Sequence, residues 1–400
     1  MELFVFEDEL VRRFYPLTLT KPAFSLLYGA RTILDSIGST FSPDHVSFRV
    51  RDYLRPLVSS RYGPSEPEFD GYVLFANALL KPRRIEPKAD EFILASGGRV
   101  ALAKLKGEKA RRFSDSLKPD RSIAEVYEAP DLLFEYPWEL ISFTEALKSQ
   151  LPSGGPRQVD SCTVLGDPSK LVVKDSEVEP YCTFDTRNGP IFIDGAKIES
   201  GTRIEGPAYI GKGARLMGAK VKSSVIMEEV RLGGEVDTSV VEGYSNSAHK
   251  SYLGHSYVSS WVNVGAGSVT SDLKNTYGTV KMNLDGRRID TGLLKLGSFI
   301  GEGVKASIGT MIYCGKRIGP FSHIHGYVLE DVPSFTIYAK GLGSEPTELY
   351  LESAIRTQRR MMARRGVELD DGYRAMMEAL FRLTEEERAK AGVKKGGFKI

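Results

Sequence analysis

The stretch SNSAHKSYLGHSYVSSWVNVGAGSVT, residues 245–270, carries a hydrophobic pattern that returns every six residues, at Tyr252, Val258, Val264 and Thr270. This period fits neither an α-helix nor an alternating strand. It is typical of a solenoid with one short strand and one corner per repeat. His249 lies at the edge of the pattern, where an imidazole on the outer wall of a coil is suited to accept a proton from a bound substrate.

The same period extends to both sides of this stretch. It relates Ile198, Ile204, Ile210 and Leu216, and later Ile300, Ala306, Ile312, Ile318 and Ile324. Residues 271–292 interrupt it with a longer excursion. We therefore predict one β-helix over residues 160–340, with three strands and about 18 residues in each coil and the periodic aliphatic side chains stacked inside.

The flanking regions have different patterns. Residues 1–155 predict an α/β domain, with strands at ELFVF, GYVLFANALL, EFILAS and VALAKLK and helices at SLLYGARTILDSI and WELISFTEALKSQL. The segment SQLPSGGPRQVDS is rich in Pro, Gly and Ser and predicts a linker. Residues 345–400 predict a helical tail that covers the open end of the β-helix, and Thr384 with Glu387 suggests a capping box.

The composition of the chain indicates which kinds of binding partner and which cellular compartment to expect. The net charge is only +2, from 54 basic and 52 acidic residues, which argues against nucleic acid or a membrane surface as a partner. We find no apolar run that spans a bilayer, and MELFVFEDEL carries acids where a signal peptide needs bases. The three cysteines form no CxxC pair, so we expect a cytoplasmic protein without a disulfide framework or structural zinc site.

AHKSYLG followed by WVNVGAGSVT resembles the left-handed hexapeptide-repeat acyltransferases. The closest likeness is to the bifunctional UDP-N-acetylglucosamine diphosphorylase/glucosamine-1-phosphate N-acetyltransferase family. PLTLTKPAFSLLYGARTIL, FANALLKP and YPWELI resemble a branch of it with a shortened nucleotidyltransferase-like domain. The resemblance implies a Rossmann-like α/β domain, then a left-handed parallel β-helix and a helical tail. It also implies a homotrimer with active sites between neighbouring β-helices.

The resemblance assigns roles to residues of the β-helix. His249 matches the general base that takes a proton from the amine of an amino-sugar 1-phosphate, most simply glucosamine-1-phosphate, during acetyl transfer from acetyl-CoA. The remaining matches are Tyr252 and Asn263 for the sugar phosphate, the backbone around Gly265 and Ala266 for acetyl-CoA or the developing oxyanion, and Lys340 for the coenzyme A phosphates. The chain departs from the family at Asp272, where an asparagine is usual. It also lacks a match for the basic residue that the family has upstream of His249, and Lys250 and Lys274 are the candidates to replace its charge.

In the N-terminal domain, Arg13 and Pro16-Leu17-Thr18 match the nucleotidyltransferase motif, whereas Glu9 and Val11 replace glycines of its phosphate-binding loop. Arg13 and Lys21 are the candidate phosphate contacts, with Arg12 and Arg31 as further candidates. Asn77 lies where the family often has a metal-binding aspartate. If the domain is active it is expected to use Mg²⁺ and a nucleotide such as UTP. Otherwise it only binds a nucleotide or caps the β-helix.

These features leave three functional hypotheses. The first is an N-acetyltransferase with a possible second step that makes UDP-N-acetylglucosamine. The second is a non-catalytic nucleotide-sugar-binding scaffold, in which His249 and Lys340 are ordinary surface residues and Asn263 is a corner residue. The third is a nucleotidyltransferase using UTP or dTTP on an oligomerising β-helix. Zinc bound by His255, His323 and His325 across a trimer interface is an alternative, but the spacing typical of zinc ligands is absent, so we predict no metal site in the β-helix.

Overall fold

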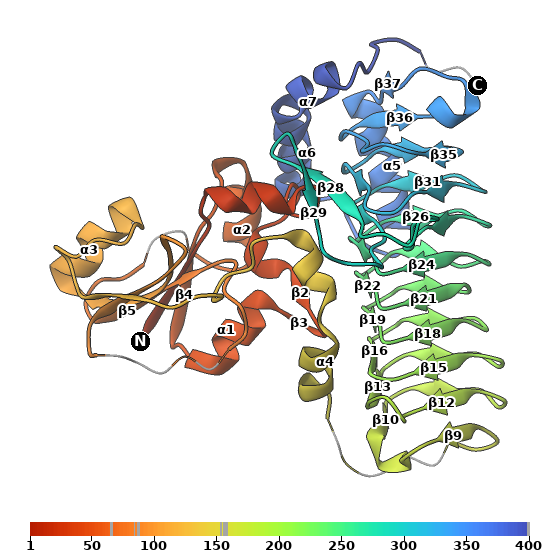
Figure 1. The fold of residues 1–400 in the computed structure, drawn as a ribbon, viewed down its shortest axis with the longest axis horizontal. Coiled ribbons are helices and arrows are strands. Elements are labelled where there is room, and N and C mark those ends of the chain that lie inside the picture. The colour runs from red at the N-terminus through yellow and green to blue at the C-terminus, as the bar shows by residue number, and fades with distance from the viewer. Residues whose placement is uncertain (65–66, 84, 86–88, 153, 155–158, 398–400) are drawn as a thin grey trace.

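The computed structural model describes residues 1–64, 67–83, 85, 89–152, 154 and 159–397. It contains an N-terminal α/β domain, a parallel β-helix and a C-terminal group of helices, in the predicted order. Figure 1 shows the α/β domain beside the coils of the β-helix, with the C-terminal helices near the upper end of the junction. The predicted fold class is confirmed, while five of the thirteen residues of the predicted linker, 153 and 155–158, lie outside the described residues.

A six-stranded sheet forms the N-terminal domain, in the order β4-β1-β5-β7-β6-β8. Its strands are β1 (Glu2–Phe6), β4 (His45–Arg49), β5 (Tyr72–Asn77), β6 (Phe92–Ser96), β7 (Arg99–Lys106) and β8 (Val126–Glu128). β1 pairs in parallel with β4 and β5, and Phe6 lies opposite Asn77. The carboxyl ends of β1 and β5 therefore lie side by side, at the edge where α/β sheets place ligands.

The helices of this domain differ from two predicted spans. The first predicted helix begins only at α1 (Ile33–Phe41), because Thr32 and Asp35 form a capping box there, and the residues before it form two short strands, β2 (Leu27–Tyr28) and β3 (Arg31–Thr32). The second predicted helix is divided into a 3-10 turn, Pro137–Ile141, and α4 (Thr144–Gln150). The other two helices are α2 (Arg55–Arg61) and α3 (Gly107–Ser116).

Three sheets form the walls of the β-helix. The first contains β10 (Leu171–Lys174), β13 (Ile191–Asp194), β16 (Ala208–Ile210), β19 (Val225–Ile226), β22 (Val240–Val241), β25 (Tyr257–Val258), β30 (Phe299–Ile300) and β33 (Arg317–Ile318). The second contains β11 (Glu177–Val178), β14 (Lys197–Ile198), β17 (Arg215–Leu216), β20 (Arg231–Leu232), β23 (Asn246–Ser247), β26 (Asn263–Val264), β31 (Lys305–Ala306), β34 (His323–Ile324), β36 (Thr336–Tyr338) and β37 (Thr347–Glu348). The third contains β9 (Thr163–Leu165), β12 (Thr183–Asp185), β15 (Arg203–Glu205), β18 (Lys220–Lys222), β21 (Glu235–Asp237), β24 (Tyr252–Gly254), β27 (Val269–Thr270), β32 (Met311–Ile312) and β35 (Tyr327–Val328).

The interior of the β-helix is the predicted stack of aliphatic side chains. Ile198, Ile204, Ile210 and Leu216 are fully buried, and the residues of the later periodic run are buried as well. Where the period slips near Val221 and Ile226, the coils are shorter and the strands remain in register, so both side chains still point inward. The tight corners contain many left-handed residues, including His255 at φ 46° and Trp261 at φ 60°.

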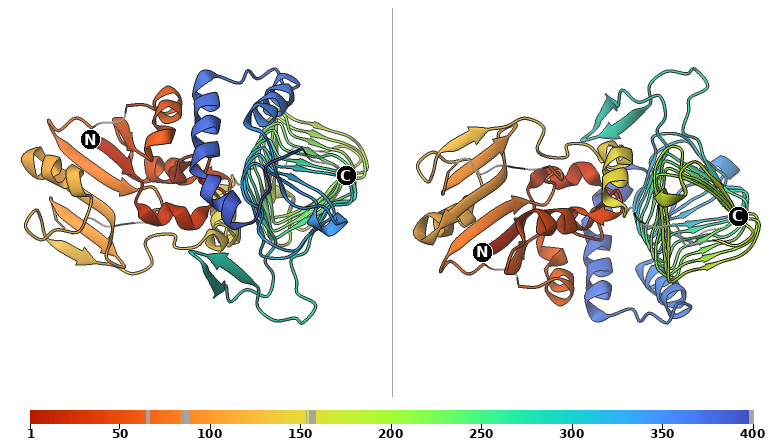
Figure 2. Two further views of the ribbon diagram at one scale, coloured as in Figure 1. Left: turned by 90° about the horizontal axis from the view of Figure 1, so that it is seen from above. Right: turned by 90° about the horizontal axis from the view of Figure 1, so that it is seen from below.

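Two segments join the β-helix to the N-terminal domain. The excursion forms a hairpin of β28 (Lys281–Leu284) and β29 (Arg287–Asp290), and the tail forms α5 (Leu351–Ala363), α6 (Asp371–Leu383) and α7 (Glu385–Lys390). Figure 2 shows the hairpin and the C-terminal helices on opposite sides of the junction. α6 packs against α2, so the tail fills the junction, while β37 pairs with β36 at the end of the coils.

The capping box predicted at Thr384 is wrong. Thr384 lies directly between α6 and α7, and its hydroxyl donates to the Leu380 carbonyl at 2.8 Å instead of capping the next helix. It also accepts a hydrogen bond from Arg388 at 2.8 Å. A threonine that bonds back to the preceding turn is a common alternative to capping.

Candidate functional site

A ladder of polar side chains runs along the outer face of the second sheet. Arg231 pairs in register with Asn246, Asn246 with Asn263, and Asn263 with Lys305. Each of these residues precedes a buried residue of its own strand, so the side chains point outward on the same wall. The β-helix therefore stacks groups from separate repeats into one polar surface.

Helix α5 faces this ladder and encloses a cavity of about 830 Å³. His249, Asn263, Gly265 and Ala266 line it together, so four of the predicted site residues meet at one place. The cationic residues of the lining are Arg215, Arg231, Lys305, Arg360, Arg364 and Arg365. No carboxylate is among the described lining residues, although Glu199 pairs with Arg215 and Glu229 pairs with Arg231 and Arg365 from outside the lining. The remaining excess of cations favours an anionic ligand.

His249 lies at the corner between β23 and β24, and it is exposed. Its ring has no hydrogen-bond partner among the residues that the structure describes. Beside it, Arg365 donates to Asn246 Oδ1 at 2.5 Å, which anchors α5 to the ladder. Burial and the neighbouring Arg231 lower the pKa of Arg365, as expected where cations crowd together.

Lys305 was not singled out from the sequence, although the structure places it in the lining beside Asn263. Its ammonium donates to the carbonyls of Trp261 at 3.0 Å and Gly303 at 2.6 Å. Burial lowers the pKa of Lys305 to about 7. The adjacent His323 has its pKa lowered to about 4 by burial and by Lys305. Lys305 could have been identified as a site residue from its pairing with Asn263. The long insertion before β30 interrupts the six-residue period, so this pairing cannot be read from the sequence.

The two small residues of the GAG motif have different roles. The Gly265 N–H donates to the Ala306 carbonyl at 3.0 Å, so it is not open to a ligand as we expected. A Cβ at Gly265 would lie 2.6 Å from Ile308 N, which shows that glycine is needed for the approach of the next coil. Among the described residues nothing accepts the Ala266 N–H, which leaves this group for a ligand.

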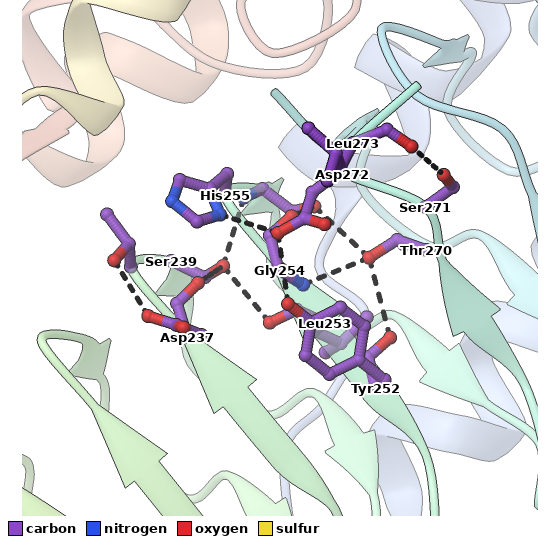
Figure 3. A network of polar contacts seen from close by, with 12 residues as sticks. Asp237, Ser239, Tyr252, Leu253, Gly254, His255, Thr270, Ser271, Asp272 and Leu273 are labelled. Carbon is purple, nitrogen blue, oxygen red and sulfur yellow. Dashed lines mark hydrogen bonds and ion pairs between the residues drawn. The ribbon is translucent and has the colours of Figure 1, made fainter. Parts of the chain in front are cut away.

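Tyr252 and Asp272 do not line the cavity; they form a separate network on the third sheet, which Figure 3 shows. Asp272 Oδ2 accepts from the Tyr252 hydroxyl at 3.0 Å and lies 2.7 Å from His255 Nδ1. Burial favours the neutral acid, but these two hydrogen bonds outweigh it and lower the pKa of Asp272. The aspartate that departs from the family pattern thus has its own histidine partner.

The two lysines predicted for substrate and coenzyme A also lie outside the lining. Lys250 is exposed next to His249. Lys340 follows β36 and forms an ion pair with Glu330 at 2.9 Å, on the exposed surface. Within one chain, the structure therefore groups His249 with the arginines of α5 and leaves both lysines at the surface.

In the N-terminal domain, the end of β5 is closed by hydrogen bonds. Asn77 is fully buried, donates to Asp8 at 2.8 Å and to the Val100 carbonyl at 3.1 Å, and accepts from Leu79 N at 3.0 Å. Arg99 binds the Asp8 carboxylate in bidentate fashion, at 2.8 and 3.0 Å. A guanidinium therefore occupies the cation position beside Asp8, and these residues do not fit a magnesium ion.

Arg13 and Lys21 reach toward other parts of the chain. Arg13 forms an ion pair at 3.2 Å with Asp285 in the turn between β28 and β29. Lys21 pairs with Glu242 of the β-helix. Both predicted phosphate contacts thus hold the domain against the β-helix. The loop after β1 is a 3-10 helix, Glu9–Phe14, capped by Asp8, rather than an open glycine loop.

Metal-binding clusters, disulfides and membrane-spanning helices are three further features that bear on function. Within the described part of the chain, no group of three or more His, Cys, Asp or Glu side chains is arranged to hold a metal ion. All three cysteines are free thiols. None of the described helices has the length and apolar character needed to cross a membrane.

Known proteins resemble parts of this chain. Residues 3–150 match the sugar nucleotidyl transferase family. The bifunctional sugar-1-phosphate nucleotidylyltransferase/acetyltransferase of Sulfurisphaera tokodaii is 38% identical over 104 residues, covering 26% of each chain. The bifunctional protein GlmU of Methanocaldococcus jannaschii is 32% identical over 98 residues, covering 24% of each.

The matches span about a quarter of the length of these relatives. Among solved structures, the UDP-N-acetylglucosamine acyltransferase of Francisella novicida has a TM-score of 0.37 at 14% identity, covering 57% of this chain and 78% of that one. Residues 3–150 are thus similar to sugar nucleotidyl transferases, and about a quarter of the chain is similar to bifunctional sugar-1-phosphate nucleotidylyltransferase/acetyltransferases.

Proposed function

We propose that this protein transfers an acetyl group from acetyl-CoA to the amine of an amino-sugar 1-phosphate, with glucosamine-1-phosphate as the first substrate to test. The single observation that carries the proposal is the grouping of exposed His249 with Asn263 and six cationic side chains around one cavity. Both substrates of this reaction carry phosphate, which suits a cationic wall without a carboxylate. The partial similarity to the bifunctional sugar-1-phosphate nucleotidylyltransferase/acetyltransferase of Sulfurisphaera tokodaii supports the same chemistry.

In this reaction the amine nitrogen attacks the thioester carbonyl, a C–N bond forms, and the C–S bond to coenzyme A breaks. His249 accepts the proton that the amine loses, because an imidazole titrates close to neutral pH. The Ala266 N–H is placed to stabilise the developing oxyanion. Asn263 positions the sugar, and the α5 arginines bind phosphate oxygens of either substrate.

We further propose a homotrimer in which Tyr252, Asp272, Lys250 and Lys340 approach the site of a neighbouring chain. The third sheet and its corners expose an apolar set that suits such an interface, namely Ile308, Met311, Tyr313, Tyr327, Leu329 and Leu342. A particle of three times 44.2 kDa in light scattering would support this assembly, whereas a monomer would refute it.

The test is the release of coenzyme A from acetyl-CoA in the presence of glucosamine-1-phosphate. His249→Ala is expected to lower kcat by about 10²- to 10⁴-fold, which is the usual contribution of a general base. His45→Ala, an exposed histidine on β4, is the matched control and should be unaffected. Equal turnover by the wild type and His249→Ala would rule out the proposed base.

Nucleotidyl transfer from UTP to the sugar 1-phosphate is the second candidate, favoured by the family match of residues 3–150. Any magnesium ion would need ligands other than Asp8 and Asn77, which are occupied by Arg99 and by one another. Pyrophosphate release with UTP, compared with dTTP, tests this activity. Binding of UTP without pyrophosphate release would mean that the domain has kept a nucleotide site without catalysis.

A further inference from the structure

A second cavity, of about 430 Å³, lies where the three parts of the chain meet. The N-terminal domain contributes the segment around Thr20 and Lys21, the β-helix contributes Glu228, Glu242 and Trp261, and α6 contributes Tyr373. It is separate from the cavity beside His249, with which it shares no lining residue. No role in the proposed reaction is assigned to it.

Most charged groups of this cavity are engaged within the protein. Glu242 pairs with Lys21 and accepts from the Tyr257 hydroxyl at 2.7 Å and from Ser260 N and Oγ at 3.0 and 3.1 Å. Glu302 accepts from the Tyr373 hydroxyl at 2.6 Å, and Arg61 forms an ion pair with Asp370 at 3.3 Å. These contacts hold the three parts of the chain together.

One carboxylate and one hydroxyl of the lining have no hydrogen bond or ion pair to another described side chain. Burial and the neighbouring Glu242 raise the pKa of Glu228, while its own backbone N–H and Lys21 act in the opposite direction. Thr20 is 2% exposed, and its hydroxyl has no hydrogen-bond partner among the described residues. Buried polar groups in proteins are usually hydrogen-bonded, so a carboxylate and a hydroxyl that line one cavity are suited to bind a ligand.

We propose that this junction cavity binds a small hydroxylated amine, such as an amino sugar without a phosphate, through Glu228 and Thr20. Glu228 is suited to a cationic ligand because Lys21, the cation that acts on it, is already paired with Glu242, and the hydroxyl of Thr20 matches a ligand hydroxyl. Tyr244 and Trp261, stacked at 4.3 Å, supply an apolar wall that suits a sugar ring or an ammonium group.

The charge balance argues against a phosphorylated ligand here. Lys21 and Arg61 are already paired, and Glu228 would repel a phosphate. The cavity beside His249 has the opposite character, with six cations and no acid in its described lining. The two sites would therefore separate unphosphorylated from phosphorylated amino sugars by electrostatics.

The fluorescence of Trp261 offers a local readout of ligand binding. The chain contains two tryptophans, and the other, Trp138, stacks on Tyr136 at 4.4 Å in the N-terminal domain. In a Trp138→Phe protein the emission comes from Trp261 alone. We expect glucosamine to change it at concentrations at least tenfold lower than N-acetylglucosamine, which has the same ring without the cationic amine.

Glu228→Gln should abolish the preference for glucosamine while leaving the cavity shape intact. Glu235→Gln, which removes the same charge from an exposed pair with Lys220 on the third sheet, should leave the preference unchanged. Thr20→Val should lower the affinity for both sugars. Equal affinity for the two sugars, or unchanged selectivity in Glu228→Gln, would overturn the proposal, as would a failure of glucosamine to alter Trp261 emission.

Two further measurements separate this site from the proposed acetyltransferase site. The change in Trp261 fluorescence on binding glucosamine should persist in His249→Ala. This result would show that ligand binding in the junction cavity does not depend on acetyl transfer. Glucosamine affinity should also fall with decreasing pH as Glu228 becomes protonated, beginning above the usual carboxyl range because its pKa is raised. If inorganic phosphate rather than glucosamine changed the Trp261 emission, the assigned ligand class would be wrong.

Discussion

The end of β1 and β5 in the N-terminal domain differs sharply from the face of the β-helix beside His249. At the strand ends, Asp8 is engaged by both Asn77 and Arg99, and Asn77 is also bonded to Val100 and Leu79, although Arg99 Nη1 has no hydrogen-bond partner among the described residues. Beside His249, the exposed imidazole and the guanidinium groups of Arg360 and Arg364 line a cavity with no side-chain partner among the described residues, whereas Arg215, Arg231 and Arg365 are paired with glutamates. Polar groups that the protein itself saturates stabilise the fold, whereas polar groups left open are available to a ligand. Family resemblance alone does not distinguish these two situations.

The largest expected effect tests whether Asn77 is structural. Asn77→Ala leaves the Leu79 N–H and the Val100 carbonyl without their partner, so the free energy of unfolding should fall by about 2–4 kcal/mol. Urea denaturation measures this, with exposed His249→Ala as the control, which should change stability by less than about 0.5 kcal/mol. A stable Asn77→Ala protein that has lost pyrophosphate release would show instead that Asn77 serves catalysis.

The second prediction concerns the pH dependence of stability at Lys305. Its folded pKa of about 7 lies below the ordinary value of 10.5, so the native protein releases a proton that the unfolded chain retains. The stability should therefore rise with pH between about 7 and 10. Lys305→Met should show a flatter pH profile of Tm than the wild type. Parallel profiles for the two proteins would mean that Lys305 is charged in the native state.

A smaller effect is expected from the arginines of α5. Arg364→Ala should raise the KM for acetyl-CoA about fivefold at low salt, with less effect at high salt, because an exposed phosphate contact contributes about 1 kcal/mol. Arg359→Ala removes the same charge from the same helix but does not line the cavity, so its KM should match the wild type. If both variants raised the KM for acetyl-CoA equally, the effect would come from the overall charge of α5 and not from a specific phosphate contact by Arg364.

The smallest effect is expected at Asp272. Its lowered pKa contributes stability above the ordinary carboxyl pKa, and this contribution is lost as the pH falls through the folded value. Asp272→Asn should therefore reduce stability at neutral pH by about 1 kcal/mol and flatten its acid dependence below about pH 4. Because the proposed trimer brings Asp272 to the active site of a neighbouring chain, acetyl transfer by Asp272→Asn should also fall. Unchanged acetyl transfer would mean that the Asp272–His255 network is only structural within the chain.

The sequence predicted most of the β-helix because its core is set by local repetition. Ile198 and Leu216 lie on the six-residue period and are also neighbours in the second sheet, so one pattern gives both burial and pairing. The shorter elements were less predictable, because Thr32 and Asp35 start α1 after an unexpected pair of short strands. Capping and turn contacts of this kind depend on a few side chains rather than on a period.

For the candidate site, the sequence by itself identified His249, Asn263 and the GAG corner, because they lie within one coil and its successor. Lys305 and Arg364 depend on contacts between distant segments, after an excursion and a change from strand to helix, which no local pattern records. The same holds for Glu228 and Thr20 at the junction. Local periodicity thus determined the β-helix and the place of its histidine, while tertiary packing decided which polar groups were saturated and which were left open to a ligand.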